Sequence, residues 1–237
     1  MFVFVCSRNT GNWQNELFSM KFFGYIEHAI YINLDYRTDR RTAVERQYKE
    51  LGLEVERFPA IQLNPEEVDN PENDPQWHNK MACTRSHFEC IRIAKERKLQ
   101  NIWIMEDDVV FVPEFLTKAQ RVVDELKASE WDMFFFGGEP NRRSVPHSEH
   151  LVRTNGVYGA HSYFVNHTFY DKMLGISIDN KISDIIYLAF DESIKTFLLS
   201  KEILCYQDDT SVSDLWGGKI ARKELYRNAY KLYVDGV

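Results

Sequence analysis

Three consecutive carboxylates, Glu106, Asp107 and Asp108, are the side chains of this sequence best suited to bind a metal ion. They follow the apolar run 101–105, and apolar residues resume at Val109, as in a buried strand with a polar end. Adjacent acids are costly to bury unless a cation lies nearby. Because side chains alternate along an extended chain, we expect Glu106 and Asp108 on one side, binding one hard cation, and Asp107 in a structural position on the other. The alternative is a solvated strand end that only turns the chain.

A basic turn before residue 41 is the second candidate. The predicted strand 29–34 leads through a turn into a helix that begins with Arg40 and Arg41. Backbone N–H groups at a helix start and guanidinium groups both suit phosphate. Alternatively, Arg40 and Arg41 only pair with Asp39 and Glu45. Neither GxGxxG nor GxxxxGK[ST] occurs here, so the usual dinucleotide and P-loop fingerprints are absent.

Isolated histidines and acids supply further candidates. His87 lies on a predicted helix, His161 follows two small residues in a predicted strand, and Asp184 follows a loop. Such residues act as catalytic acids or bases, but packing explains the histidines as simply, and helix capping explains Asp184. The polar segment 207–214, which begins with Gln207, is either a turn or a second set of ligands.

The four cysteines, at positions 6, 83, 90 and 205, are too few and too scattered for a disulfide scaffold, so we expect a reducing compartment. Cys83, His87 and Cys90 share a helical face, which raises the question of zinc. Positions seven apart on a helix are separated by about 10.5 Å along its axis, too far for both sulfurs to reach one ion. We therefore expect no zinc site there.

The length and the composition are those of an ordinary globular protein. At 237 residues, with 44% hydrophobic and 27% charged residues, the chain is sized for one large domain. A net charge of −7 argues against nonspecific nucleic-acid binding. No segment is long enough to span a bilayer, residues 1–6 make no convincing signal peptide, and we expect a cytoplasmic protein. The oligomeric state stays open, as does a peripheral membrane contact of the basic, aromatic end, residues 219–233.

Hydrophobic periodicity predicts an α/β fold, in which a strand-helix-strand unit, residues 29–61, lays its two strands parallel. More antiparallel signals follow in the second half, including a hairpin around Asn155-Gly156. We expect a single domain with a mixed, mainly parallel central sheet. The expected helices are 40–51, 82–97, 113–128, 166–174, 184–193 and 219–233, and the expected strands are 29–34, 55–61, 101–106, 131–136, 151–154, 159–165, 197–199 and 203–207.

Taken together, these motifs resemble glycosyltransferase family 25, the lipooligosaccharide-biosynthesis and procollagen-galactosyltransferase family. The resemblance covers residues 29–214 and depends on several motifs in the same order, which is more specific than any one of them. They are INLDYRTDRR at 32–41, CTRSH at 83–87, MEDD at 105–108, WD at 131–132, GG at 137–138, GAHSY at 159–163, Asp184, Gln207 and the pair 213–214.

The resemblance implies a GT-A-type, Rossmann-like fold, a UDP-sugar donor, a manganese-like divalent cation and inversion at the anomeric carbon. Within it, Asp108 and Glu106 would hold the metal ion, Asp184 would be the base, and His161 would face the sugar or the acceptor. The residues next to the bound donor would be Asn33, Leu34, Arg37, Arg41, Ser86, His87, Glu106 and Asp107.

The function expected from the sequence is metal-dependent transfer of a hexose, galactose or a similar sugar, from a nucleotide-diphosphate sugar to a glycan or protein hydroxyl, as in lipopolysaccharide biosynthesis. Residues 1–25 would be an N-terminal extension, 26–216 the transferase domain and 217–237 a C-terminal helix packed on it. One alternative is a catalytically silent module of the same fold that binds glycans or nucleotides. Another is a metal-dependent phosphoester hydrolase, which would need more His and Asp ligands for its two metals.

Overall fold

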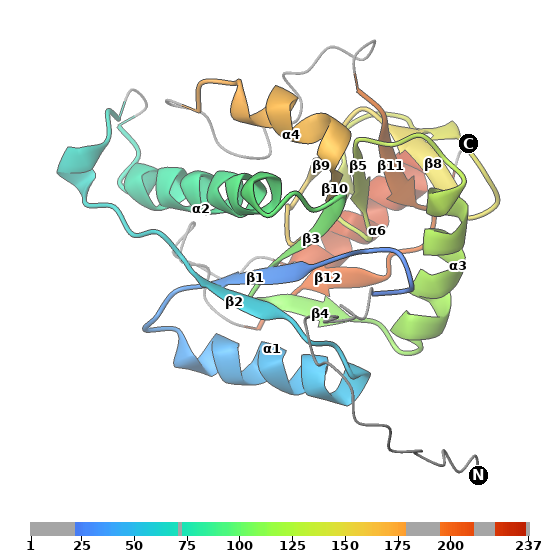
Figure 1. Ribbon diagram of the computed structural model, residues 1–237, viewed down its shortest axis with the longest axis horizontal. Helices are drawn as coiled ribbons and strands as arrows, with labels where there is room; N and C mark the ends of the chain where they lie inside the picture. The colour runs from blue at the N-terminus through green and yellow to red at the C-terminus, as the bar shows by residue number, and fades with distance from the viewer. Residues whose placement is uncertain (1–21, 71–72, 179–194, 211–220, 236–237) are drawn as a thin grey trace, which may run out of the picture.

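The computed structural model describes residues 22–70, 73–178, 195–210 and 221–235. Its centre is an eight-stranded sheet with helices on both faces (Figure 1). Six of these strands run in one direction, and β8 and β10 run in the other, so the predicted mixed, mainly parallel sheet is confirmed. The strand order is β2 (Glu56–Pro59), β1 (Ala29–Asn33), β3 (Asn101–Glu106), β10 (Ser162–Asn166), β5 (Met133–Phe135), β11 (Phe197–Ser200), β8 (Leu151–Thr154) and β7 (Val145–Pro146).

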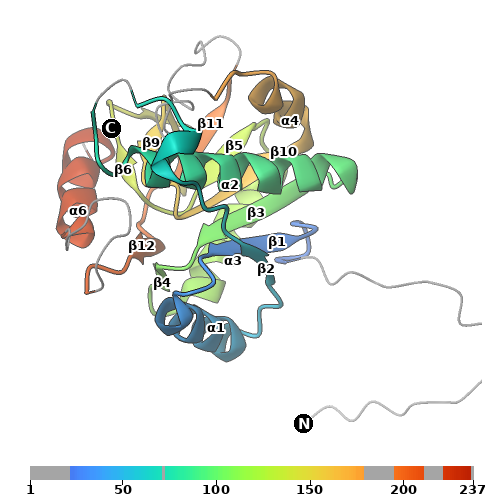
Figure 2. The ribbon, with the colours of Figure 1, turned by 90° about the vertical axis from the view of Figure 1, so that its left-hand side faces the viewer.

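Side chains of the central strands alternate between two cores. Ile102 and Ile104 of β3 face the core under α2 (Trp77–Glu96) and α4 (His167–Leu174), whereas Trp103 and Met105 face the core under α1 (Thr38–Leu51) and α3 (Phe115–Lys127). Turning the molecule by 90° shows α2 across one face of the sheet and α1 on the other (Figure 2). Burial on both faces explains why these strands have apolar sequences without polar alternation.

The carboxyl ends of three neighbouring parallel strands, β2, β1 and β3, lie side by side. β1 is parallel to both β2 and β3, with Ile32 opposite Phe58 on one side and Glu106 on the other. This arrangement confirms the predicted strand-helix-strand unit. The carboxyl ends of parallel strands meet at one edge of the sheet, where ligands bind in open α/β folds. Asn33 and Glu106 therefore lie at the same edge.

Helix starts differ most from the sequence-based expectation. α2 begins five residues before the predicted start, because Asp74 accepts hydrogen bonds from Gln76 N and Lys80 Nζ and stabilises an additional first turn. It follows a loop that contains the short 3-10 helix Pro65–Glu67. α3 begins at Phe115 rather than at Pro113, since Glu114 adopts a left-handed conformation with φ 62°.

The predicted hairpin around Asn155-Gly156 is wrong. β8 pairs with β11 and β7, whereas β10 lies between β3 and β5. The turn signal is local, but β10 is buried along nearly its whole length and takes a partner on each side. The intervening β9 (Val157–Tyr158) pairs instead with β6 (Glu139–Pro140).

The C-terminal elements close the end of the sheet near the acids. β12 (Cys205–Gln207) is antiparallel to β4 (Val109–Phe111), so Gln207 lies opposite Val109, and α6 (Arg222–Tyr233) packs against β12 and β6. A Cβ at Gly137 would meet the Cys205 carbonyl oxygen at 2.3 Å, so the glycine permits this close approach.

The rest of the described chain completes the core. Phe22 and Phe23 pack around Trp103 with ring centroids 5.9 and 6.0 Å away, so the end of the predicted N-terminal extension contributes to the domain. No helix among the described residues combines the length and apolar character needed to cross a membrane. The predicted helix 184–193 lies outside the described residues.

Candidate active site at the carboxyl edge of the sheet

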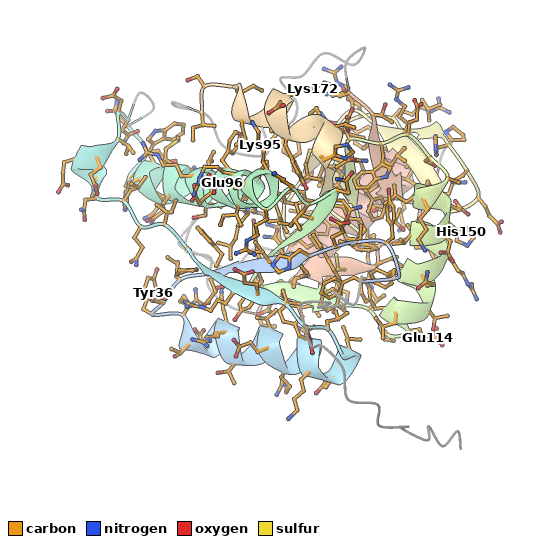
Figure 3. All side chains as sticks on the ribbon, in the orientation of Figure 1. Tyr36, Lys95, Glu96, Glu114, His150 and Lys172 are labelled. Carbon is orange, nitrogen blue, oxygen red and sulfur yellow. The ribbon has the colours of Figure 1, made fainter. Side chains whose placement is uncertain are left out.

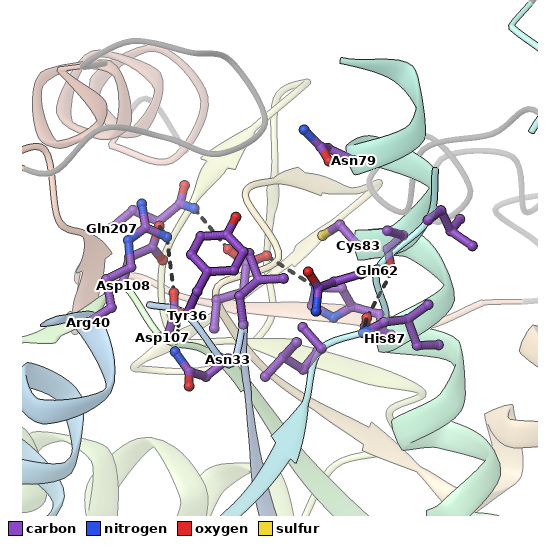
Figure 4. Close-up of a pocket in the computed structure, with 18 of the residues that line it drawn as sticks. Asn33, Tyr36, Arg40, Gln62, Asn79, Cys83, His87, Asp107, Asp108 and Gln207 are labelled. Atoms are coloured by element: carbon purple, nitrogen blue, oxygen red, sulfur yellow. Dashed lines mark hydrogen bonds and ion pairs between the residues drawn. The ribbon is translucent and has the colours of Figure 1, made fainter. Parts of the chain in front are cut away.

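A cavity of about 190 Å³ opens where β1, β2 and β3 end. The loop after β2 and the residues Ile32 and Leu34 supply apolar contacts, and polar side chains gather on two opposite walls (Figure 4). One wall carries Arg40, Asp107, Asp108 and Gln207, and the other, from α2, carries Asn79, Cys83 and His87.

All three acids of the central motif line this cavity. β3 ends at Glu106, and Asp107 and Asp108 form a turn before β4. The predicted alternation, with Asp107 on the opposite side, is therefore wrong, because it assumed an extended backbone through Asp108. A hydrogen bond of 2.7 Å from the Asp208 N–H to the Asp108 carbonyl oxygen holds the turn against the end of β12.

Both carboxylate oxygens of Glu106 have protein partners. His87 Nε2 lies 3.2 Å from Glu106 Oε1, and Gln207 Nε2 donates a hydrogen bond of 3.1 Å to Oε2. Burial opposes ionisation of this carboxyl, but the hydrogen bond to His87 and the charge of that ring lower the pKa of Glu106 below its ordinary value. Glu106 is the one acid of the three whose pKa is lowered, whereas burial raises the pKa of Asp107 and of Asp108.

Both oxygens of Asp107 are held as well. Asn33 Nδ2 donates to Oδ2 at 2.7 Å, and Arg40 Nη1 lies 3.0 Å from Oδ1. These contacts join the end of β1 and the first turn of α1 to the acidic turn. This arrangement suits a structural position for Asp107.

Asp108 differs from its neighbours. Its Oδ2 lies 3.7 Å from Arg40 Nη1, and its Oδ1 is buried without a hydrogen-bond partner among the described residues. Burial and the neighbouring Glu106 raise the pKa of Asp108 well above its ordinary value. A buried oxygen without a partner next to a second carboxylate is the environment that a hard divalent cation would complete.

Four of the predicted donor-binding residues outside the acidic motif line the cavity, namely Asn33, Leu34, Ser86 and His87. Ser86 Oγ accepts a hydrogen bond of 2.9 Å from the Ile61 N–H and donates one of 2.8 Å to the Ala82 carbonyl. Ser86 thus fastens the loop after β2 to α2 and fixes the distance between two walls of the cavity.

Arg37 and Arg41 do not line the cavity. Arg37 pairs with Asp39 at 3.0 Å, and Arg41 pairs with Glu45 at 3.0 Å. Arg40 points toward the acids instead, a role that the sequence-based assignment missed. Helical periodicity does not separate Arg40 from Arg41, since they precede the core residue Val44 by four and three positions and both lie within one turn of it.

The sequence-based assignment also did not include Tyr36 among the site residues. It lines the cavity although 60% of its surface is exposed, and it lies on the turn between β1 and α1 (Figures 3 and 4). Nothing in its sequence context separates it from an ordinary turn residue, because α2 and β12, which complete the cavity, come from distant parts of the sequence.

His161 lies behind the cavity rather than on its surface. Its ring is fully buried, stacks on Tyr226 with centroids 5.4 Å apart, and has Nδ1 3.0 Å from the Gly159 carbonyl. Tyr226 in turn donates a hydrogen bond of 2.7 Å to Gln207 Oε1. Burial lowers the pKa of His161, which favours the neutral form of the ring. The predicted base, Asp184, lies outside the described residues.

Because the folded state holds the Asp108 proton to a higher pH than the unfolded chain does, this carboxyl lowers stability increasingly as pH rises above about 4. We expect Asp108→Asn to raise Tm at pH 7, in the presence of a chelator, by about 2–4 °C, the shift that about 1 kcal/mol produces in a protein of this size. The gain should shrink toward pH 4. Calorimetry on wild type, Asp108→Asn and the exposed control Asp124→Asn measures it, and an equal or lower Tm for Asp108→Asn at pH 7 would contradict the assignment.

Comparison with known proteins identifies the family. The family model described as "Glycosyltransferase family 25 (LPS biosynthesis protein)" matches residues 26–155. A "Glycosyltransferase 25 family member" of Drosophila pseudoobscura pseudoobscura is 32% identical over 161 residues, 60% of this chain and 26% of that protein. "Procollagen galactosyltransferase 1-B" of Xenopus laevis is 24% identical over 227 residues, 86% of this chain and 36% of that protein.

The chain thus spans between about a quarter and about a third of the length of these relatives. Among solved structures, a glycosyltransferase involved in the glycosylation of the major capsid of PBCV-1 matches with a TM-score of 0.44 and 9% identity, covering 86% of this chain and 98% of that chain. Since the family model matches more than half of its 237 residues, the chain belongs to glycosyltransferase family 25.

Proposed function

We propose that this chain transfers a hexose from a nucleotide-diphosphate sugar, with UDP as the nucleotide, to a hydroxyl of a glycan or protein acceptor, with inversion. One observation carries the proposal: the buried Oδ1 of Asp108 has no hydrogen-bond partner among the described residues and lies beside Glu106 in the cavity. Family membership supports sugar transfer. The position at the carboxyl edge of parallel strands supports a nucleotide ligand.

The acidic turn fits a divalent cation such as Mn²⁺, which prefers carboxylate oxygens. Asp108 and Glu106 would hold it. When bound, the cation neutralises the donor diphosphate and helps the nucleotide to leave. Arg40 supplies one positive charge next to up to three negative ones, so the protein alone does not balance the charge of the turn. The cation would remove the main cost of ionising Asp108.

The remaining walls suit the organic part of a donor. Tyr36 offers an exposed aromatic face for stacking on a base, and the amides of Gln62 and Asn79 line the cavity within reach of polar ligand atoms. The acceptor hydroxyl needs a base, and Asp184 is proposed for this role from the family motif. We propose that His161 acts on the site indirectly, by positioning Tyr226 and through it Gln207.

The acceptor classes proposed for this chain come from the names of the matching family model and of its relatives. The family model is described with LPS biosynthesis, and several relatives are named procollagen galactosyltransferases. A glycan and a hydroxylated protein are therefore the two acceptor classes to test, with galactose as the first sugar. The cytoplasmic location expected from the sequence stays a prediction.

The first prediction from the proposed function tests the metal and the donor together. Asp108→Ala should abolish Mn²⁺-dependent UDP binding and donor hydrolysis and leave the fold intact, because it removes the carboxylate oxygen best placed for the cation. Calorimetry of UDP binding with and without Mn²⁺ measures this, with Asp124→Ala, an exposed acid on α3, as the control. Manganese dependence retained in Asp108→Ala would contradict the ligand assignment. Absence of UDP binding in wild type under both conditions would refute the proposed function.

The second prediction concerns the base of the nucleotide. Base stacking on an aromatic ring is worth about 1–3 kcal/mol, so Tyr36→Ala should weaken UDP binding by about 5- to 150-fold. Tyr36→Phe keeps the ring and should bind UDP nearly as wild type does. The same titration calorimetry measures both variants, and an equal loss in the two would show that the hydroxyl rather than the ring contributes.

The third prediction concerns the acceptor. Asp184→Asn should slow transfer by about 10²- to 10⁴-fold, the usual contribution of a general base, and should change UDP affinity much less. Single-turnover transfer and UDP titration on the same preparation separate the two effects. An unchanged transfer rate would exclude Asp184 as the base.

A further inference from the structure

Three side chains in the cavity form a group that differs chemically from the acidic turn. Cys83 and His87 lie one turn apart on the inner face of α2, and Glu106 ends β3 opposite them. The Cys83 sulfur, a ring nitrogen of His87 and a carboxylate oxygen of Glu106 all lie within 4.8 Å of one another. The Cys83 sulfur is a thiol, not part of a disulfide.

We propose that Cys83, His87 and Glu106 form a binding site for a borderline-soft divalent cation, Zn²⁺, with the fourth position open to the cavity. Thiolate and imidazole ligands favour Zn²⁺, whereas oxygen ligands favour Mn²⁺ or Mg²⁺. Thiolate, imidazole and carboxylate groups all bind zinc, and an open zinc site has three protein ligands. The fourth ligand would be water or a group of a bound substrate.

The distance that excludes Cys83 and Cys90 as joint zinc ligands does not exclude this set. The Cys90 side chain is fully buried in the core on the sheet side of α2. Cys83 and His87 are four residues apart, about 6 Å along the helix axis, and their side chains lie on one face. The third ligand comes from β3 and not from the helix, which a helical pattern alone does not reveal.

His87 is oriented for metal binding. Its Nδ1 lies 2.9 Å from the Tyr163 hydroxyl, and its Nε2 lies 3.2 Å from Glu106 Oε1. When Nδ1–H donates to Tyr163, Nε2 is the nitrogen left to face a cation, the arrangement that hydrogen-bonded metal ligands adopt. Cation binding would displace any proton that Nε2 and Oε1 share and would also release the thiol proton of Cys83.

The geometry needs little adjustment. Zinc bonds of about 2.3 Å to sulfur and about 2.0–2.2 Å to nitrogen and oxygen place tetrahedral ligand atoms roughly 3.3–3.6 Å apart. The ligand atoms already lie within 4.8 Å of one another. Side-chain rotations that bring them together by about 1 Å reach the tetrahedral separations. Cys83 and Glu106 are both only partly buried, so the cavity provides the room for these rotations.

Occupancy of this site would oppose catalysis, an inference that rests on the proposed function. Glu106 belongs both to this group and to the acid pair proposed for the catalytic cation. A Zn²⁺ ion held from the α2 wall would withdraw Glu106 from that pair and from its hydrogen bond to Gln207. It would also fill space between the walls that the donor must enter. The site would thus be inhibitory.

Spectroscopy with Co²⁺ tests binding without an activity assay. The wild-type chain of 237 residues, titrated with Co²⁺, should show a thiolate-to-cobalt charge-transfer band and the intense visible bands of a four-coordinate ion. Zn²⁺ should displace Co²⁺ and abolish both. Cys83→Ser should lose the charge-transfer band and bind at least about 100-fold more weakly, since losing even a hydrogen-bond partner of a ligand costs roughly 10- to 100-fold. Cys90→Ala, on the same helix, should keep the band.

Absence of the charge-transfer band in wild type, or its persistence in Cys83→Ser, would overturn the proposal. A measurement on wild type alone guards against folding failure of the variants: Zn²⁺ should protect Cys83 from alkylation, as read by peptide mass spectrometry. Equal alkylation with and without Zn²⁺ would also overturn it.

A final comparison separates this site from the proposed function. Asp108→Asn should keep the thiolate band while losing Mn²⁺-dependent UDP binding, so failure of one result leaves the other standing.

The inhibitory role is tested by transfer rates, each variant being compared with its own rate without zinc. Micromolar Zn²⁺ should inhibit wild type and Cys90→Ala but not Cys83→Ser. Zinc binding without inhibition of wild type would refute the inhibitory role.

Discussion

Repulsion among three adjacent carboxylates at the end of a buried strand is the constraint on which this structure depends. Each acid is stabilised by a side chain from another part of the chain. His87 of α2 and Gln207 of β12 contact Glu106, and Asn33 and Arg40 contact Asp107. Asp108 is left with a buried oxygen that lacks a hydrogen-bond partner among the described residues. The native state therefore retains an electrostatic cost that a bound cation would relieve, as functional sites often do at the expense of stability.

The topology explains how distant segments reach these acids. β1, β2 and β3 are parallel, so their carboxyl ends coincide, and the helices that follow or precede them begin near the same edge. β12 arrives from the opposite end of the sequence because it pairs with β4, the strand that continues directly from the acidic turn. Four elements thus hold one turn. The site is a property of the sheet edge, which fits the position of ligand sites in other open α/β folds.

Much of the fold and the place of the acidic turn in it were predictable from the sequence. The predictions that differ from the structure do so for specific physical reasons. Buried strands and the first strand-helix-strand unit follow from local hydrophobic periodicity, and so does the position of the acids at a strand end. The hairpin around Asn155-Gly156 failed because pairing is decided by which neighbours bury each strand, not by the turn. The contact of Arg40 with the acids was not foreseen, because Arg40 and Arg41 both lie within one turn of Val44 and the helical pattern does not separate them. The expected alternation of the three acids failed because the extended strand ends at Glu106, two residues before Asp108.

The hydrogen bond from Tyr226 to Gln207 has a consequence for how the domain is delimited. By donating to Oε1 of the Gln207 amide, the tyrosine hydroxyl fixes which end of that amide faces Glu106, so that an N–H rather than a second oxygen meets the carboxylate. Tyr226 belongs to α6, the last helix of the chain. A boundary drawn at residue 216 would sever the helix that decides this orientation. The smallest unit that preserves the acidic site must therefore include the C-terminal helix, which is a component of the site and not an appendage.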